Sequence, residues 1–161
     1  MAESLVVGVD LGGTKIYTAL ARETGELLAE VKIPTEAAGG VEHVLRRIVR
    51  SVREVEKQSG SCGKIVGLAV GVPGTLHPFQ GIVYQAPNLG WLDVPLKGLL
   101  EEALQMPVAV DNDANLAALG EYVFGAGQRV NDLVYVTVST GIGSGLILGG
   151  KLYTGASFGA G

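Results

Sequence analysis

The nearly continuous apolar run from Lys64 to Val72 is the sequence feature that most restricts the possible folds of this chain. A strand that is apolar on both faces is expected inside a sheet whose two faces are both covered. Three segments rich in β-branched residues precede the run at 5–9, 16–21 and 27–33, and the Gly-containing turns between them are typical of a meander. The four segments together predict a mixed sheet.

Helical patterns alternate with these strands. Apolar residues between Val41 and Val55 recur at spacings of three and four, which predicts an amphipathic helix of about five turns. After a polar loop that contains Asn88 and Trp91, Asp93 is expected to cap a short helix whose buried side carries leucines.

The next elements complete the predicted domain. A short strand is expected at 108–110, and Asn112 or Asp111 then caps a helix that runs to about Phe124. The sequence 125–127, which is Gly-Ala-Gly, is a common signal for the end of a helix. The order β-β-β-α-β-α-β-α predicts an α/β fold, with helices on the faces of a mixed sheet.

The remainder of the chain has too few elements for a domain of its own. Strands are predicted at 133–139 and 145–148, joined by a Gly-rich turn, and no helix follows to cover the pair. A two-stranded unit is marginally stable alone. We therefore predict one domain over residues 1–128 and the start of a truncated second, similar domain over residues 129–161.

Charge and composition argue against several classes of protein. The chain has 12 Lys and Arg against 16 Asp and Glu, a net charge of −4, and so no general attraction for nucleic acid. Its apolar runs are far too short to span a bilayer, and Met1–Ser4 lacks the basic region of a secretion signal. Cys62 is the single cysteine and only two histidines accompany it, so neither a disulfide nor a metal cluster is predicted. We expect a cytoplasmic enzyme or binding domain.

The 25 glycines include two clusters that are candidates for binding phosphate. In the first, Asp10–Lys15, adjacent glycines let backbone N–H groups approach an anion, Thr14 adds a hydroxyl, and Asp10 could hold Mg²⁺ through water. The second is Thr140–Gly145. Its spacing departs from a dinucleotide-binding fingerprint and a strand follows it, so a dinucleotide site is not predicted. A tight hairpin without a ligand is the alternative for both clusters.

Residues 111–115, Asp-Asn-Asp-Ala-Asn, form the strongest single motif. Four polar side chains at a strand-to-helix junction are more than one N-cap requires. The positive end of a helix favours an ionised Asp113, which suits a carboxylate that must accept a proton from a hydroxyl, and Asn112 could bind a neighbouring hydroxyl.

Together these motifs resemble those of the ROK family (repressor, open reading frame, kinase) of sugar kinases, within the actin-like ATPase superfamily of ribonuclease H-like domains. The resemblance covers the whole chain and rests on elements in the family's order. They are Asp10–Lys15, Gly71–Gly74, Asn88-Leu89 with Trp91, Asn112–Asn115 and Thr140–Gly145.

The resemblance implies a two-domain cleft in which a hexose hydroxyl is phosphorylated by ATP with Mg²⁺. It makes Asp113 the catalytic base, Asn112 a sugar ligand and Asp10 the carboxylate that holds Mg²⁺ through water. Asn88 and Gly71 are expected on the sugar side. Phosphate contacts are expected from Gly12, Gly13, Thr14, Lys15, Thr140, Gly141 and Gly143.

The family continues beyond the point that corresponds to Gly161, with a Glu and a His that hold the sugar and then a Cys-rich zinc motif. The resemblance therefore implies that this chain is the N-terminal part of a longer kinase, inactive alone. Structural zinc is expected only in the missing part, and a homodimer is possible for the full-length protein. Glucose is the favoured hexose.

Two other functions stay open. Some family members join this domain to a DNA-binding module and act as sugar-responsive repressors, although Met1–Ser4 alone precede Leu5 and leave no room for a helix-turn-helix. Alternatively, the chain is a folded, non-catalytic sugar-binding fragment.

Overall fold

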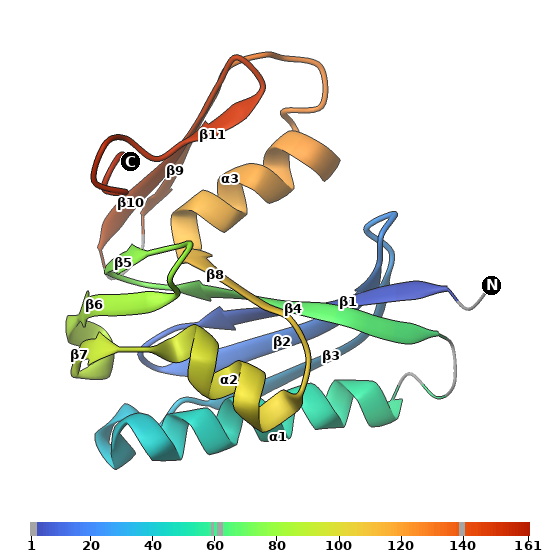
Figure 1. Cartoon of the computed structure of the whole chain (residues 1–161). Coiled ribbons are helices and arrows are strands. Elements are labelled where there is room, and N and C mark those ends of the chain that lie inside the picture. The colour runs from blue at the N-terminus through green and yellow to red at the C-terminus, as the bar shows by residue number, and fades with distance from the viewer. Residues whose placement is uncertain (1–2, 59, 61–62, 139–140) are drawn as a thin grey trace.

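A computed structural model describes residues 3–58, 60, 63–138 and 141–161 of the chain. Its central sheet has the strand order β3-β2-β1-β4-β8 (Figure 1). The strands are β1 (Ser4–Leu11), β2 (Lys15–Arg22), β3 (Leu27–Pro34), β4 (Lys64–Val72) and β8 (Val108–Asn112). β2 is antiparallel to β1 and β3, whereas β1, β4 and β8 run parallel. The predicted meander and the mixed sheet are confirmed.

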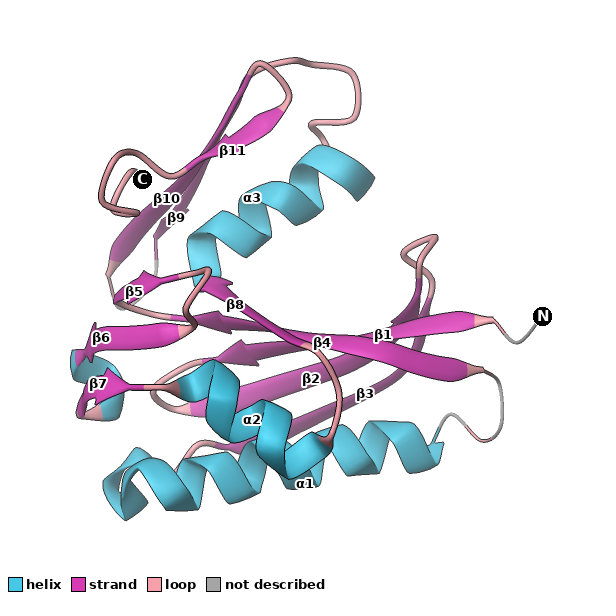
Figure 2. Cartoon of the chain, viewed as in Figure 1, coloured by secondary structure: helices cyan, strands magenta, loops and turns pink. Residues whose placement is uncertain are grey.

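Two helices pack on one side of this sheet, α1 (Gly40–Gln58) and α2 (Leu96–Leu104), as Figure 1 shows. α1 has the predicted apolar face, and Val44, Ile48 and Val52 are fully buried on it. β1 alternates strictly, so Leu5 to Leu11 bury every second side chain in the core while Asp10 points to the opposite face. α3 (Asp113–Phe124) lies on that opposite side, which Figure 2 also shows.

The polar loop expected before α2 is instead a small antiparallel sheet of β5 (Thr75–His77), β6 (Ile82–Ala86) and β7 (Trp91–Val94). The short 3₁₀ helix η2 (Pro87–Leu89) connects β6 to β7, and η1 (Ala37–Gly39) precedes α1. Trp91 is 2% exposed and belongs to the main core. Three-to-five-residue strands between Gly and Pro residues are too short for period-2 alternation to identify.

The predicted role of Asp93 as a helix cap is wrong. Asp93 lies in β7 with a left-handed φ of 50°, and Pro95 occupies the N-cap position of α2 without a side-chain cap bond. The helix begins after Pro95 because proline fixes φ at a helical value and its missing N–H costs nothing at a helix start. Asp93 therefore lies two residues before the N-cap position.

A third sheet has the order β11-β10-β9 and consists of β9 (Leu133–Val138), β10 (Ile142–Leu148) and β11 (Lys151–Tyr153). Three expectations for this part are corrected. β10 begins at Ile142 rather than at Gly145, because residues 142–144 pair with β9 instead of forming a turn. The strand β11 was not expected. The strand pair is also covered on one face, since α3 packs against both β9 and β10. None of the described helices is long and apolar enough to cross a membrane.

The contact between β10 and α3 depends on Gly145. A Cβ at this position would lie 2.6 Å from the carbonyl oxygen of Ala114 and 2.6 Å from Cβ of Ala118. Both atoms belong to the helix backbone or to a short side chain, so neither can move aside without shifting α3 or β10.

We expect Gly145→Ala to lower the free energy of unfolding of this chain by about 1–3 kcal/mol through overpacking, measured by urea denaturation. Gly120→Ala is the matched control, because a Cβ at Gly120 meets no atom within 4 Å on the surface of α3. That variant should be about 1 kcal/mol more stable, since alanine favours a helix over glycine. Equal stabilities of the two variants would contradict the close approach of β10 to α3.

Candidate functional site

The carboxyl ends of the parallel strands bring three of the sequence motifs to one edge of the central sheet. In the strand register Asp10 of β1 lies beside Gly71 of β4, and Gly71 lies beside Asp111 of β8. This is the edge at which open α/β sheets place their ligands. Asp10 and residues 71–74 and 111–115, far apart in the sequence, are therefore neighbours in the fold.

An open cleft of about 560 Å³ lies at this edge, between the sheet on one side and α3 and β9 on the other. Three of the predicted site residues line it: Asp10, Gly71 and Asp113. The other lining residues are Gly8, Val9, Tyr17, Ala19, Ala69, Ala114, Leu116, Ala117, Tyr135 and Thr137. The walls are mostly apolar, so the two carboxylates are the main charged groups of the cleft.

Asp113 is the first residue of α3 and is only partly buried. Its Oδ1 accepts a hydrogen bond from the backbone N–H of Ala114 at 2.9 Å. No donor among the described residues reaches its other carboxylate oxygen. A carboxylate at a helix N-terminus is stabilised in its charged form by the helix dipole. Asp113 thus presents a carboxylate oxygen to the cleft.

Asn112 is the N-cap of α3, which confirms it over Asp111 as the predicted cap. Its Oδ1 accepts from the N–H groups of Ala114 at 2.9 Å and Asn115 at 3.3 Å, and its Nδ2 donates to the carbonyl of Gly74 at 3.3 Å. An amide NH₂ group has two donors, so one N–H of Asn112 stays available for a ligand hydroxyl. Because the cap occupies its side-chain oxygen, Asn112 can offer a ligand only an N–H donor.

The remaining polar residues of this motif brace the junction. Asn115 is 3% exposed, and its Nδ2 donates to Oδ1 of Asp111 at 3.0 Å. The same oxygen accepts from the backbone N–H of Asn112 at 2.6 Å. Asp111 and Asn115 consequently fix the turn from β8 into α3, which positions Asp113.

Asp10 has a raised pKa. Partial burial of its carboxyl group in the cleft contributes most, and the negative charge of Asp113 raises the pKa further, while Lys15 lowers it. The charge of Asp113 is thus close enough to disfavour ionisation of the Asp10 carboxyl. A cation between them would relieve this repulsion, and carboxylates are the ligands that Mg²⁺ prefers.

The raised pKa predicts how stability depends on pH. The folded chain binds the Asp10 proton more tightly than the unfolded chain, whose carboxyl has the ordinary value of 3.8. As pH rises from that value through the folded pKa, Asp10 therefore makes the wild type progressively less stable. We expect Asp10→Asn to raise the Tm above the wild-type value at pH 7 and to lose this advantage toward pH 4. Asp93→Asn, far from the cleft, is the control. A difference in Tm that does not change with pH would contradict this assignment.

The first glycine cluster forms the tight turn from β1 to β2, in which the N–H of Gly12 donates to the carbonyl of Lys15 at 2.9 Å. A Cβ at Gly13 would lie 2.8 Å from the carbonyl oxygen of Asn88 and 2.9 Å from its Cβ. The turn therefore touches η2, and it brings Asn88 next to the predicted phosphate loop. Thr14 and Lys15 are exposed at the tip.

The second glycine cluster lies at the start of β10. Gly141 is exposed, and Gly143 lies against Thr137 and Ala114. Thr140 lies outside the described residues, as does Cys62. The cleft lining therefore contains no residue of this cluster among those described, although Thr137 on the paired strand does line it.

Several residues of the site had no recognisable signal in the sequence. Tyr17, Tyr135 and Thr137 line the cleft from the middle of ordinary strands. Thr35, which follows β3, is fully buried and bonds to the glycine turn. Their positions depend on long-range strand pairing. Among the described residues there is no group of three or more His, Cys, Asp or Glu side chains that could enclose a metal ion.

Comparisons with known proteins identify relatives over nearly the whole chain. The sequence profile of the ROK family matches residues 6–161. A glucokinase from Halalkalibacterium halodurans is 37% identical over 158 residues, which are 98% of this chain and 48% of the relative. A xylose repressor from Caldicellulosiruptor bescii is 36% identical over 153 residues, 94% of this chain and 38% of the relative.

Solved structures agree with these matches. A ROK family glucokinase from Streptomyces griseus, solved in complex with glucose and AMPPNP, superposes with a TM-score of 0.86 at 38% identity. The match covers 94% of this chain and 46% of that structure. The chain thus spans about half the length of the kinases that it matches, and the expected actin-like ATPase fold is confirmed.

Proposed function

Because the chain belongs to the ROK family, we propose that it is the N-terminal part of a sugar kinase that transfers the γ-phosphoryl group of ATP to a hexose hydroxyl. One observation carries the proposal: Asp113, on a helix N-terminus, shares a single cleft with Asp10, beside the turn that contains Gly12 and Gly13. The glucokinase relatives support a kinase, and the glucose and AMPPNP in the Streptomyces griseus structure support the substrate classes.

Asp113 acts in this proposal as the general base. Its free carboxylate oxygen accepts the proton of the attacking hydroxyl, and this contributes about 10²–10⁴-fold to the rate. Asn112 donates its remaining N–H to a sugar hydroxyl, and Asn88 and Gly71 lie on the sugar side. Phosphoryl transfer depends mainly on positioning and on charge stabilisation, which backbone N–H groups provide at fixed positions.

The carboxylates of the cleft fit a divalent cation, and the glycine turn that follows Asp10 fits the phosphates of a nucleoside triphosphate. The observation that favours a cation is that the carboxylates of Asp10 and Asp113 line the same cleft, and Asp10 would hold Mg²⁺ through water. When bound, Mg²⁺ neutralises charge on the transferred phosphoryl group. The backbone around Gly12, Gly13, Thr14 and Lys15, together with Thr140, Gly141 and Gly143, would bind phosphate oxygens.

We further propose that residues 129–161 are the first strands of a second domain, after a first domain over 1–128. The face of β9 away from α3 supports this, because Val134, Val136 and Val138 are 63%, 56% and 76% exposed. A row of exposed valines on a strand is unusual for a finished domain. The whole protein's activity and its zinc or homodimer would depend on that second domain.

The kinase proposal is tested with the complete gene product in a coupled assay that measures ADP release. We expect ADP formation that requires both ATP·Mg²⁺ and a hexose, with glucose as the first hexose to test. ADP release that is the same with and without any hexose would contradict the proposal.

A sugar-responsive transcriptional regulator is the second candidate, because a xylose repressor is as similar to this chain as the glucokinases are. DNA binding depends steeply on salt when phosphate contacts drive it. Sugar-sensitive and salt-dependent binding of the gene product to DNA, without ADP release, would favour the regulator.

A further inference from the structure

The turn that contains the predicted phosphate loop is held by a residue outside that motif. Thr35 follows β3 and is 0% exposed. Its hydroxyl donates to the carbonyl of Gly12 at 2.6 Å, and its backbone N–H donates to the carbonyl of Thr14 at 2.9 Å. One buried residue thus binds the loop at two points.

These two bonds determine which way the peptide groups of the loop point relative to Thr35. The described chain contains no cis peptide bond. In a trans peptide the C=O and the following N–H point in opposite directions. Because Thr35 binds the carbonyls of Gly12 and Thr14, the N–H groups of Gly13 and Lys15 point away from Thr35. The partially negative carbonyl oxygens are therefore kept on the side away from these donors, which is the polarity that an anion site requires.

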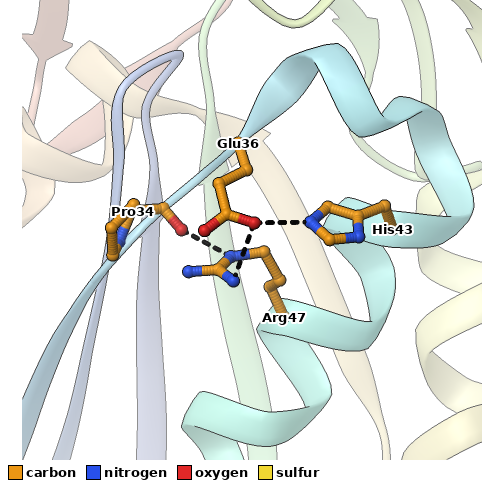
Figure 3. Close-up of polar contacts among 4 residues, drawn as sticks. All are labelled: Pro34, Glu36, His43 and Arg47. Atoms are coloured by element: carbon orange, nitrogen blue, oxygen red, sulfur yellow. Dashed lines mark hydrogen bonds and ion pairs between the residues drawn. The ribbon is translucent and has the colours of Figure 1, made fainter.

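The two chain neighbours of Thr35 are held by α1, and Figure 3 shows the contacts of Pro34 and Glu36 with Arg47 and His43. The Nε of Arg47 donates to the carbonyl of Pro34 at 2.6 Å, and its Nη1 lies 3.1 Å from Oε2 of Glu36. The Nε2 of His43 donates to the same carboxylate oxygen at 2.8 Å. Glu36 adopts a left-handed conformation with φ 54°, which a non-glycine residue keeps only when its surroundings hold it there. Both neighbours of Thr35 are thus tied to α1.

The geometry points to Thr35 as a positioning residue of the phosphate loop, held by Arg47 through residues 34–36. The expected effect on ATP binding rests on the proposed kinase function, whereas the positioning of the loop by Thr35 rests on the hydrogen bonds alone. A threonine that only filled the core would contribute to stability and would not selectively change the KM for ATP·Mg²⁺.

The test compares Thr35→Val with Thr35→Ser in the complete gene product. Valine keeps the shape and removes the hydroxyl, so we expect KM for ATP·Mg²⁺ to rise about tenfold from the loss of one buried hydrogen bond. KM for the hexose should change less than about twofold, and serine should restore most of the ATP affinity. Thr18→Val is the matched control, because Thr18 is equally buried and its hydroxyl bonds to Ser51 at 2.7 Å, away from the loop.

Hydrogen–deuterium exchange gives a readout that needs no turnover. Exchange of the hydrogen-bonded backbone amides of residues 12 and 35, which donate to the carbonyls of Lys15 and Thr14, should accelerate in Thr35→Val and remain at the wild-type rate in Thr18→Val. If the wild type shows no kinase activity, the proposed function fails, whereas the exchange rates and the dissociation constant of ATP·Mg²⁺ still decide the role of Thr35. The inference would be overturned by unchanged amide exchange rates in Thr35→Val, or by equal changes in the KM or dissociation constant of ATP·Mg²⁺ in Thr35→Val and Thr18→Val.

A second pair of variants covers the case in which Thr35→Val does not fold. Arg47→Met removes both contacts to residues 34 and 36, and a smaller rise of about threefold in KM for ATP·Mg²⁺ is expected. Arg46→Met is its control, because Arg46 pairs only loosely with Glu42 at 3.8 Å on the solvent side of the helix. An Arg47→Met protein with the ATP affinity of the Arg46→Met protein would contradict the inference.

Discussion

Asp113→Asn is expected to lower kcat of the complete gene product by about 10²–10⁴-fold while the hexose still binds. An amide cannot accept the proton of the attacking hydroxyl. Its Oδ1 can still accept the bond from Ala114 that the carboxylate now accepts, so the start of α3 should keep its structure. The measurement is kcat by ADP release, together with the dissociation constant of the hexose by calorimetry.

Asp93→Asn is the matched control for this variant. Asp93 carries the same carboxylate, lies in β7 outside the cleft lining and has a left-handed φ that asparagine tolerates. Its kcat should equal that of the wild type. A wild-type kcat in Asp113→Asn would refute the assignment of the base, and loss of hexose binding would show that Asp113 is mainly a binding residue.

Gly13→Ala is expected to lower kcat/KM for ATP by about 10²-fold, because small displacements of positioning groups are costly in catalysis. The added Cβ would lie within 2.9 Å of both the carbonyl oxygen and the Cβ of Asn88. Neither atom is the end of a flexible side chain, so the phosphate loop and η2 must separate. We expect KM for the hexose to rise as well, because Asn88 moves with η2. Steady-state kinetics with each substrate varied in turn measures both effects.

Gly98→Ala serves as the control, since a Cβ at Gly98 on α2 meets no atom within 4 Å. It should have wild-type kinetics and a slightly higher Tm, as expected for alanine in a helix. Wild-type kinetics in Gly13→Ala would mean that the contact between the loop and Asn88 has no part in catalysis.

Much of the central sheet could be predicted because its signals are local. β-branched segments identified β1 to β3, and the apolar run identified β4 as an inner strand between β1 and β8. The three- and four-residue spacing identified α1. The sequence placed Asp10 at a strand end and Asp113 at a strand-to-helix junction, whereas their meeting with Gly71 in one cleft was implied only by the family resemblance.

The rest could not be predicted because it depends on contacts between distant segments. Nothing near Thr35 in the sequence shows that its hydroxyl binds Gly12, which lies in the turn between β1 and β2. Gly143 was predicted in a turn and Gly145 at the start of a strand, whereas both lie inside β10, where their missing side chains let α3 pack closely. Asn112 was one of two expected caps, but the sequence could not show that both cap bonds converge on its side-chain oxygen and leave only its N–H groups for a ligand.

The most direct test of the kinase proposal is the detection of its product. The complete gene product is incubated with ATP·Mg²⁺ and glucose, and the reaction is followed by ³¹P nuclear magnetic resonance. We predict a new sugar-phosphate resonance that grows as the γ-phosphate signal of ATP declines and that is nearly absent with Asp113→Asn. Conversion of ATP to inorganic phosphate with no sugar phosphate, or no loss of ATP with glucose or any other hexose, would contradict the proposal.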